Sequence, residues 1–528
     1  MQKNQLSKII LLFIIFAVVY VFIGTSGGLN IYDEAVGLLG GERVAGGELP
    51  YLDFWTMYAP GFYYLTSIVG EIFGNNIMVF RIMINLIVLV GIISILNIGR
   101  QLYQNSYGIL PAFHALIWLS GYFLYGKAIP VALSLCFVSI LFFIGYFKTG
   151  RSRSLIFAGL TAAIVMFFRH DFGAYLFIAQ SIVLLTLSSP SRSDNQAKRK
   201  DIIKYWAATA AIALPLGIYF ISAVGFNNLY IHLIEIPSKI FAEYRSLPIP
   251  IPFMSESASV GGQIKEILFS IVFYVPPIIF LITLMQLISA GKSKNENIRS
   301  IPYIIKMLIM IAGALMYSQA LIRSDAEHVM PSMIFAMLLL PGIFENIKIS
   351  KLRIVLTLAA SLFLMLLPSL NKAQTLSKIY LSSDSYELTA DKASGVKVDA
   401  EWGKNFDAMI HFMQSEIPAE EKIYVGNYSH DRILLNDIMI YYISGRASAT
   451  KYHELHPGVS TTEPVQKEMI EELKSNSVNY IVLCDNNEFL EPNKSRVSSE
   501  VYLLDEYIAE NYRELKTFGG YKILKLAE

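Results

Sequence analysis

Charge is scarce in this sequence. Of its 528 residues, 16% are Asp, Glu, Lys or Arg, whereas 54% are hydrophobic. One soluble core of this length cannot hide so much apolar surface, so the composition excludes an ordinary water-soluble protein and favours a chain embedded in a lipid bilayer. The 43 basic and 42 acidic residues leave a formal net charge of +1. This balance argues against a nucleic-acid partner.

Cysteines and nucleotide-binding motifs are also sparse. The two cysteines are Cys136, inside an apolar run, and Cys484, far away in the part of the chain expected to be soluble, so we expect no internal disulfide. The sequence has no Gly-x-Gly-x-x-Gly and no phosphate-loop signature, which are the usual marks of a nucleotide site. An activity that uses a nucleotide therefore finds no support in the sequence.

Long apolar runs are abundant instead. A hydrocarbon core of about 30 Å needs roughly 20 apolar residues per helix, and runs of that order recur eleven times. We interpret the first run as a retained span rather than a cleaved signal peptide, because the polar segment after it resembles part of a site. The expected spans are 7–24, 79–98, 107–125, 128–147, 154–168, 172–188, 206–224, 264–290, 302–321, 330–345 and 354–370.

Lysine and arginine gather in alternate loops between these runs, namely at Arg100, 148–153, 192–204, 292–299 and 348–353. Because short positively charged loops stay in the cytoplasm, we expect a cytoplasmic amino terminus and an extracytoplasmic tail. The expected parts are a membrane domain (1–370) with a long first outer loop (25–78), a linker (371–400) and a soluble α/β domain (401–528).

The tail has the pattern of a small α/β unit. Residues 422–426 and 479–483 are β-rich, and helical apolar spacing occurs near 432–443, 462–475 and 500–512. Gly519-Gly520 between two short apolar runs predicts a terminal hairpin. The predicted fold class is thus a polytopic α-helical membrane protein of about 11 spans with a C-terminal extracytoplasmic α/β domain.

The first outer loop carries adjacent acids, Asp33 and Glu34, and further on Asp53. Its end, 62–73, is apolar and aromatic, which is typical of a helix lying in the membrane interface. A reactive loop held at the membrane surface suits a lipid-borne substrate. The alternative is a packing loop in which Asp33 and Glu34 cap a helix that begins near Ala35.

Three further charged clusters fall on the expected outer face. Arg81 opens the second span, Arg169-His170-Asp171 joins two short spans, and the segment from Arg323 to His328 joins two more. Each cluster alone has a structural explanation, since charges at the edge of a span snorkel toward water. Together with Asp33 they suggest chemistry on a lipid phosphate, because guanidinium groups clamp phosphate and a carboxylate can take a proton from an attacking hydroxyl.

The long outer loop at about 225–263 adds candidates for acceptor binding. Tyr244 and Arg245 precede a rigid Pro248-Ile-Pro-Ile-Pro252 run. We group them with Asp53 as acceptor or lid residues. An inert extended connector accounts for the same loop equally well.

At these residues the sequence resembles the GT-C class of integral-membrane glycosyltransferases, in particular the bacterial relatives of the protein O-mannosyltransferases and the lipid A aminoarabinose transferase. The resemblance covers the first 100 residues or so well, the later outer loops loosely, and the tail mainly through its architecture. The resembling residues are Asp33-Glu34 after the first span, Gly46-Gly-Glu-Leu-Pro-Tyr-Leu-Asp-Phe54, Pro60 and Arg81, with Tyr442–Arg446 and His456–Gly458 in the tail.

The resemblance implies transfer of a sugar from a polyprenyl-phosphate donor, with inversion, at the outer face of the bacterial cytoplasmic membrane. The acceptor is then a glycan, a lipid or a protein of the envelope. On this view Asp33 is the general base, Glu34 supports it, and Arg81 contacts the donor phosphate.

We add Arg169, Arg323 and His328 to the phosphate-binding candidates because of their charge and their expected position on the outer face. We expect no metal site. A divalent ion is the open alternative, because Asp325, Glu327 and His328 offer ligand atoms, although a hydrogen-bonded loop accounts for them as well.

Three other functions compete. A transporter or flippase predicts charges near mid-bilayer and paired halves, whereas the charges here fall at the outer ends and we find no inverted repeat. An envelope polysaccharide polymerase or ligase would also use outer Arg and His residues, but the Asp33-Glu34 loop favours the GT-C interpretation. A binding module anchored by its spans would not need eleven of them.

Overall fold

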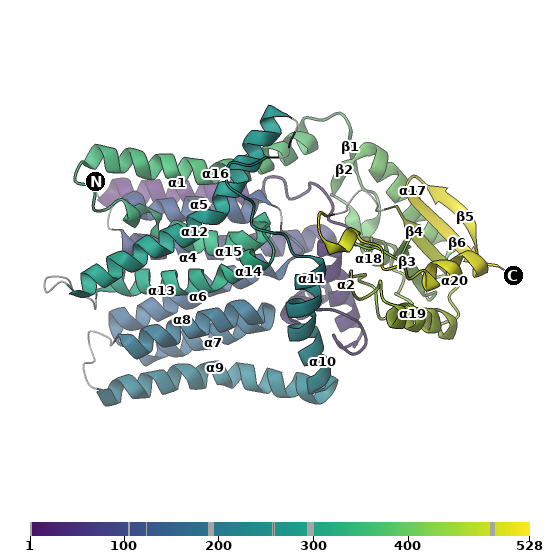
Figure 1. Cartoon of the computed structure of the whole chain (residues 1–528), viewed down its shortest axis with the longest axis horizontal. Helices are drawn as coiled ribbons and strands as arrows, with labels where there is room; N and C mark the ends of the chain where they lie inside the picture. The colour runs from purple at the N-terminus through teal and green to yellow at the C-terminus, as the bar shows by residue number, and fades with distance from the viewer. Residues whose placement is uncertain are drawn as a thin grey trace.

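The structure is a computed structural model that describes residues 3–527 except 104–105, 123, 188–194, 256, 258, 293–299 and 486–490. A bundle of long helices forms one end of the molecule and a small α/β domain forms the other (Figure 1). Short helices lie between them, across the axis of the bundle. Parts of two expected basic segments, 192–194 and 293–299, lie outside the described residues.

Seven helical stretches of the described chain are long and apolar enough to cross a membrane. A helix suits this environment because it satisfies its backbone hydrogen bonds internally. The seven are α4 (Ile77–Leu102), α6 (Ala128–Thr149), α9 (Asn195–Val224), α12 (Val260–Lys292), α13 (Ile301–Met316) with α14 (Ser318–Ile322), α15 (Ala326–Ile343) and α16 (Ser350–Tyr380).

Four shorter apolar helices join them among the described residues: α1 (Lys3–Phe22), α5 (Leu110–Gly121), preceded by the 3-10 turn η1 (Ser106–Ile109), α7 (Ser152–Phe168) and α8 (His170–Thr186). The last two are short because Arg169 between them is extended, with φ −147° and ψ 99°. The seven long helical stretches and the four shorter helices coincide with the eleven apolar runs expected from the sequence. The polytopic fold class predicted from the sequence is therefore confirmed.

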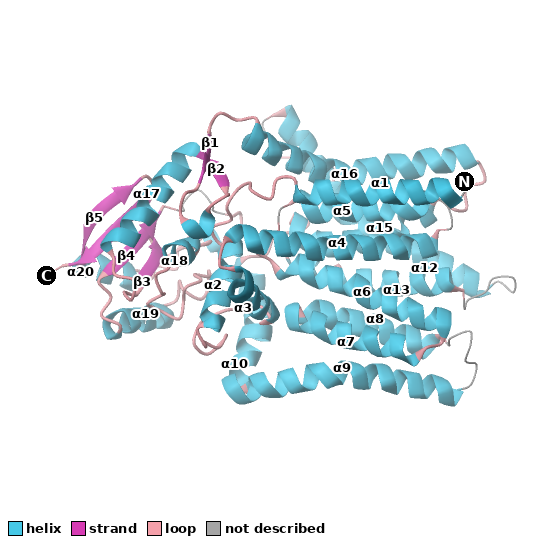
Figure 2. Ribbon diagram, turned by 180° about the vertical axis from the view of Figure 1, so that it is seen from behind, coloured by secondary structure: helices cyan, strands magenta, loops and turns pink. Residues whose placement is uncertain are grey.

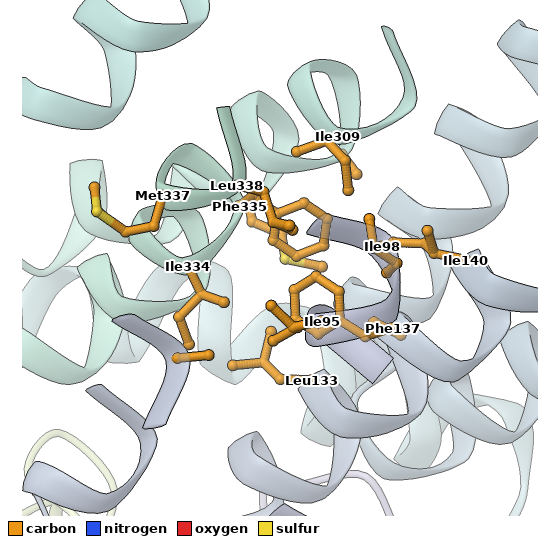
Figure 3. Packing of buried hydrophobic residues seen from close by; sticks show 14 of the residues in the cluster. Ile95, Ile98, Leu133, Phe137, Ile140, Ile309, Ile334, Phe335, Met337 and Leu338 are labelled. Atoms are coloured by element: carbon orange, nitrogen blue, oxygen red, sulfur yellow. The ribbon is translucent and has the colours of Figure 1, made fainter. Parts of the chain in front are cut away.

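The interior of the bundle is apolar and closely packed. Figure 3 shows Ile95 and Ile98 of α4 near Phe137 of α6 and Phe335 of α15, and all four side chains are fully buried. The rings of Phe137 and Phe335 have centroids 4.8 Å apart. Interdigitated packing of this kind is stiff, so the bundle gives the domain-facing end of the molecule a rigid base.

Short helices occupy the end of the bundle that faces the α/β domain (Figures 1 and 2). In the described chain these are α2 (Asp33–Ala45), α3 (Gly61–Phe73), α10 (Phe226–Tyr230), the π-helix η2 (Ile231–Phe241) and α11 (Ala242–Tyr244). α3 matches the expected interfacial helix, and its Ile72 and Phe73 are 65% and 69% exposed, as suits contact with lipid headgroups. α2 begins at Asp33, so both acids lie in its first turn.

The α/β domain contains a four-stranded sheet in the order β3-β4-β6-β5 (Figure 2). β3 and β4 are parallel and the other pairs antiparallel, so the expected strands and the terminal hairpin at Gly519-Gly520 are confirmed. The strands are β3 (Ile423–Asn427), β4 (Tyr480–Cys484), β5 (Tyr512–Phe518) and β6 (Tyr521–Leu526), and the helices α17 (Ala400–Glu416), α18 (Met439–Ser444), α19 (Glu463–Ser475), the 3-10 turn η5 (Lys494–Arg496) and α20 (Leu503–Asn511).

The expected linker at 371–400 is more ordered than its polar sequence indicated. α16 continues to Tyr380, and β1 (Ser385–Glu387) pairs with β2 (Lys397–Asp399) around the turn η3 (Asp391–Ala393). The helix α17 that follows was not expected. It begins where the Asp399 carboxylate accepts hydrogen bonds from the backbone N–H groups of Glu401 and Trp402. Such a cap is a local signal for the start of a helix, but the helix that follows it has a mostly polar face.

The α/β domain and the first outer loop share one hydrophobic cluster, which includes Ala35 and Leu39 of α2 and Ile410 of α17. Backbone hydrogen bonds join them too: the Gly28 N–H donates to the Lys397 carbonyl at 2.8 Å, and the Trp55 N–H to the Lys451 carbonyl at 2.9 Å. The domain therefore helps to position the loop that carries Asp33.

Candidate active site

Asp33 and Glu34 form the first turn of α2, where successive side chains point about 100° apart. Glu34 turns inward: Arg81 Nε and Nη2 each donate to one of its carboxylate oxygens at 2.7 Å. The same guanidinium donates to the carbonyls of Thr25 (2.8 Å) and Gly28 (2.7 Å). Arg81 is 1% exposed and Glu34 3%. Through these contacts Arg81 holds the loop before α2, and its role toward a donor phosphate stays a prediction.

Asp33 faces outward from the same turn, with 27% of its side chain exposed. Asn30 accepts the Asp33 N–H at 2.8 Å and donates its amide to Asp33 Oδ2 at 3.1 Å. Lys127 Nζ, from the residue before α6, lies 3.1 Å from the same Oδ2 and also pairs with Glu327. No sequence pattern singled out Lys127, whose only signal was a lone lysine in an expected outer loop. Asp33 is thus an accessible carboxylate anchored from two sides.

Arg323 connects the bundle to the α/β domain. Its Nε lies 2.6 Å from Asp325 Oδ2, and its Nη1 and Nη2 lie 2.8 and 2.5 Å from the two oxygens of Glu491. A carboxylate oxygen of Glu491 also lies 3.3 Å from Arg245 Nε. The Arg245 carbonyl accepts a hydrogen bond from Arg323 at 2.6 Å. His328 Nδ1 lies 2.7 Å from Asp325 Oδ1. The structure thus brings together three predicted residues, Arg323, His328 and Arg245, with a domain carboxylate that no sequence signal indicated.

Arg169 makes a separate pair with Asp171, with Nε and Nη2 at 3.0 and 2.7 Å from its oxygens. Gln319 also donates to Asp171, and the Arg169 guanidinium lies 4.6 Å from the centre of the Phe172 ring. Gln319 also connects this cluster to Arg323, whose backbone N–H donates to the Gln319 carbonyl at 3.1 Å.

Tyr58 lies where several of these charges act together. Burial raises the pKa of its hydroxyl, the negative charges of Glu454 and Asp33 raise it further, and the positive charges of Lys127 and Arg245 lower it. These four groups come from the α/β domain, the first turn of α2, the residue before α6 and the residue after α11. Their joint influence indicates that all four groups lie close enough to Tyr58 for their charges to act on its hydroxyl.

Glu454 is a buried carboxyl group that the α/β domain contributes to this region. The Tyr32 hydroxyl, directly before Asp33, donates to its Oε2 at 3.3 Å. Burial raises the pKa of Glu454 to about 8, with hydrogen bonds from Tyr32 and Thr56 acting against the shift. The carboxyl therefore keeps its proton to a higher pH than an exposed glutamate does.

Two other predicted residues lie outside these ion-pair clusters. Asp53 Oδ2 accepts the N–H of Leu49 at 2.7 Å and closes its own turn. Tyr244 lies under Lys494, whose Nζ is 4.7 Å from the ring centre. Tyr244 is adjacent in sequence to Arg245, so it borders the Arg323 cluster, whereas Asp53 does not.

Asp325, Glu327 and His328, which the sequence offered as ligands for a divalent ion, make other contacts. Asp325 Oδ1 accepts the backbone N–H groups of Glu327 and His328, both at 3.0 Å, and so caps α15. Glu327 pairs with Lys127. In the part of the chain that the structure describes, no group of three or more His, Cys, Asp or Glu could hold a metal ion. The geometry fits a hydrogen-bonded helix start.

No protein-family model matches this sequence, and no curated protein matches it in sequence. Its fold is similar to solved structures. ArnT from Cupriavidus metallidurans bound to undecaprenyl phosphate gives a TM-score of 0.55 at 12% identity over 98% of each chain, and its apo state gives 0.51 at 11% over 98% of each. The apo oligosaccharyltransferase of Archaeoglobus fulgidus gives 0.51 at 12%, over 90% of this chain and 69% of that one.

Because the sequence identities are this low, the similarity to these structures is evidence for the fold alone. The similarity to ArnT runs through both parts of the molecule, since nearly the whole of each chain is covered. It agrees with the resemblance drawn from the first outer loop, and the chain accordingly has the GT-C fold.

Proposed function

We propose that this protein is an inverting glycosyltransferase that moves a sugar from a polyprenyl-phosphate donor to a glycan, lipid or protein acceptor. The reaction takes place at the outer face of the bacterial cytoplasmic membrane. One observation carries the proposal: an accessible Asp33 carboxylate and a guanidinium pair, Arg323 with Arg245, lie at the domain-facing end of an apolar bundle. The GT-C fold supports it, and ArnT of this fold was solved with undecaprenyl phosphate bound.

The acceptor hydroxyl attacks the anomeric carbon while Asp33 takes its proton. The bond from that carbon to the phosphate oxygen breaks, and its electron pair leaves with the lipid phosphate. Asp33 suits the base role because its carboxylate is accessible, whereas Glu34 is buried against Arg81. We therefore assign Glu34 and Arg81 to holding the Asp33 turn, which is a revision of the role predicted for Arg81.

The leaving phosphate gains negative charge in the transition state. Arg323, with Arg245 and His328 nearby, is the cationic group that would stabilise this charge. It would bind the transition state more strongly than the bound donor, and such a difference in binding accelerates a reaction. Arg169 remains a second candidate from its own cluster. Tyr244, which borders Arg245, is our candidate for acceptor contact.

The test compares cells that lack the gene with cells that express the wild-type or the Asp33→Asn protein. Mass spectrometry of envelope glycans and lipids should reveal a sugar that only the wild type adds. Loss of a general base lowers rates by about 100-fold or more, so Asp33→Asn should lose that product while inserting into the membrane normally.

Glu71→Gln is the matched control, because Glu71 is an exposed acid of the same loop, on α3. It should retain full transfer. Full activity of Asp33→Asn contradicts the base assignment. A long-chain polysaccharide rather than a single added sugar would point to a polymerase instead.

A further inference from the structure

Lys127 lies where three segments distant in sequence meet. Its ammonium pairs with Asp33 from the first turn of α2 and with Glu327 from the first turn of α15. The three side chains are 21%, 27% and 28% exposed respectively. One ammonium thus joins two partly exposed carboxylates.

The chain before Lys127 is pressed against the backbone of the acidic turn. A Cβ on Gly126 would lie 2.0 Å from Glu34 Cα and 2.2 Å from Glu34 N, so glycine alone fits this approach. One residue earlier, the ring of Tyr125 lies 5.0 Å from the Arg81 guanidinium. The position of Lys127 is therefore set by backbone packing, independently of its ion pairs.

Two carboxylates that meet at one point repel each other unless a cation lies between them. A divalent ion with oxygen ligands is a common solution. Here the ammonium occupies that point, and a metal ion placed there would meet it at contact distance. Burial lowers the pKa of Lys127, but the charges of Asp33 and Glu327 outweigh this and raise it well above its usual range, so the cation persists at physiological pH.

We propose that Lys127 is the resident cation of this site: it replaces a divalent ion between Asp33 and Glu327 and makes sugar transfer independent of divalent metal. The inference rests on the proposed function. Lys127 keeps its proton throughout, while Asp33 takes the proton of the acceptor and the lipid phosphate leaves with the bond electrons. Lys127 is a positioning residue, because it acts through Asp33.

Manganese binding tests the inference without relying on activity. Full-length wild-type protein and the Lys127→Met variant are purified and titrated with Mn²⁺, and bound ion is followed by electron paramagnetic resonance. We expect the wild type to bind no Mn²⁺ at this site and Lys127→Met to bind one ion. Lys239→Met is the control, since Lys239 is exposed and pairs with Glu235 within its own helix, and should behave as wild type.

Transfer assays with and without EDTA complete the test. The wild type and Lys127→Arg should keep their activity in EDTA, whereas Lys127→Met should fall by about 100-fold, as expected for a lost charge at a reacting centre, and recover in part with Mn²⁺. Inhibition of the wild type by EDTA, or failure of folded Lys127→Met to bind Mn²⁺, overturns the inference. Should Lys127→Met not fold, the wild-type result decides.

A different result contradicts the proposed function, namely that neither the wild type nor any variant transfers a sugar under any condition. The manganese titration still judges the role of Lys127 in that case, because it requires no substrate.

Discussion

The Tyr32 hydroxyl donates a hydrogen bond to Glu454 at 3.3 Å, across 422 residues of sequence. The residue before the proposed base is thereby tied to the α/β domain. The C-terminal α/β domain is thus a structural part of the candidate site, and the consequences for stability and activity can be measured.

Glu454→Gln should change how stability depends on pH. Burial raises the pKa of Glu454 to about 8 in the folded state, from 4.5, so between these values the folded protein binds the extra proton and stability falls as pH rises. Glutamine mimics the protonated form and removes this slope. Thermal unfolding should show equal stability of both proteins at pH 4.5 and a variant that melts several degrees higher at pH 8.5. Parallel curves at all pH values would contradict the shift.

Arg81→Ala should destabilise the protein by about 3 to 5 kcal/mol, because it leaves Glu34 as an unpaired buried charge. Arg81→Lys should restore little of this loss, since an ammonium cannot reproduce the two-pronged contact. Thermal unfolding and initial rates at varied donor concentration are the measurements. Normal stability with only a raised KM for the donor would instead return Arg81 to the donor phosphate.

Glu491→Gln should bind polyprenyl phosphate more tightly than the wild type. The Glu491 carboxylate neutralises Arg323 and Arg245, and its removal frees cationic groups for an anionic ligand. We expect a gain of about 1 kcal/mol, roughly fivefold in Kd. Equilibrium binding to the full-length protein measures it, with Glu471→Gln, at an exposed position of α19, as the control. Unchanged or weaker binding would exclude these arginines from the phosphate site.

Gly126→Ala should lower stability by about 1 to 3 kcal/mol, the usual cost of overpacking, because its Cβ would collide with Glu34. Gly217→Ala is the counterpart, in α9, where a Cβ would meet nothing within 4 Å. That variant should be neutral or more stable by about 0.5 kcal/mol. Thermal unfolding of both, beside the wild type, checks the pair, and equal effects would refute the close approach.

The spans were predictable because the bilayer sets one length and one polarity for every helix that crosses it. An acid pair just after a span is also a local pattern, so the sequence could single out Asp33 as a candidate, and its role as a base stays a prediction. The same pattern did not reveal that Glu34 turns inward to Arg81. Two adjacent acids of one helical turn point in different directions, and the choice between them depends on the packing of α2 against distant segments.

Long-range partners account for what sequence reasoning missed. Lys127, Glu454 and Glu491 lie in segments without a distinctive motif, and each matters only through a contact with a residue far away in the chain. A pattern within a short window carries no information on such contacts. The order of the 371–400 segment has the same origin, since β2 is held partly by the backbone of Gly28.

The bond between Tyr32 and Glu454 also has a consequence for biosynthesis. Because Glu454 lies 422 positions after Tyr32, the ribosome takes roughly 20 to 80 seconds to reach the second partner after making the first. Throughout that interval the acidic turn lacks the domain that packs on it. The acidic turn therefore gains its contact with Glu454 only late in synthesis, and we expect a product that stalls before Glu454 to lack the packing of α2 against the α/β domain.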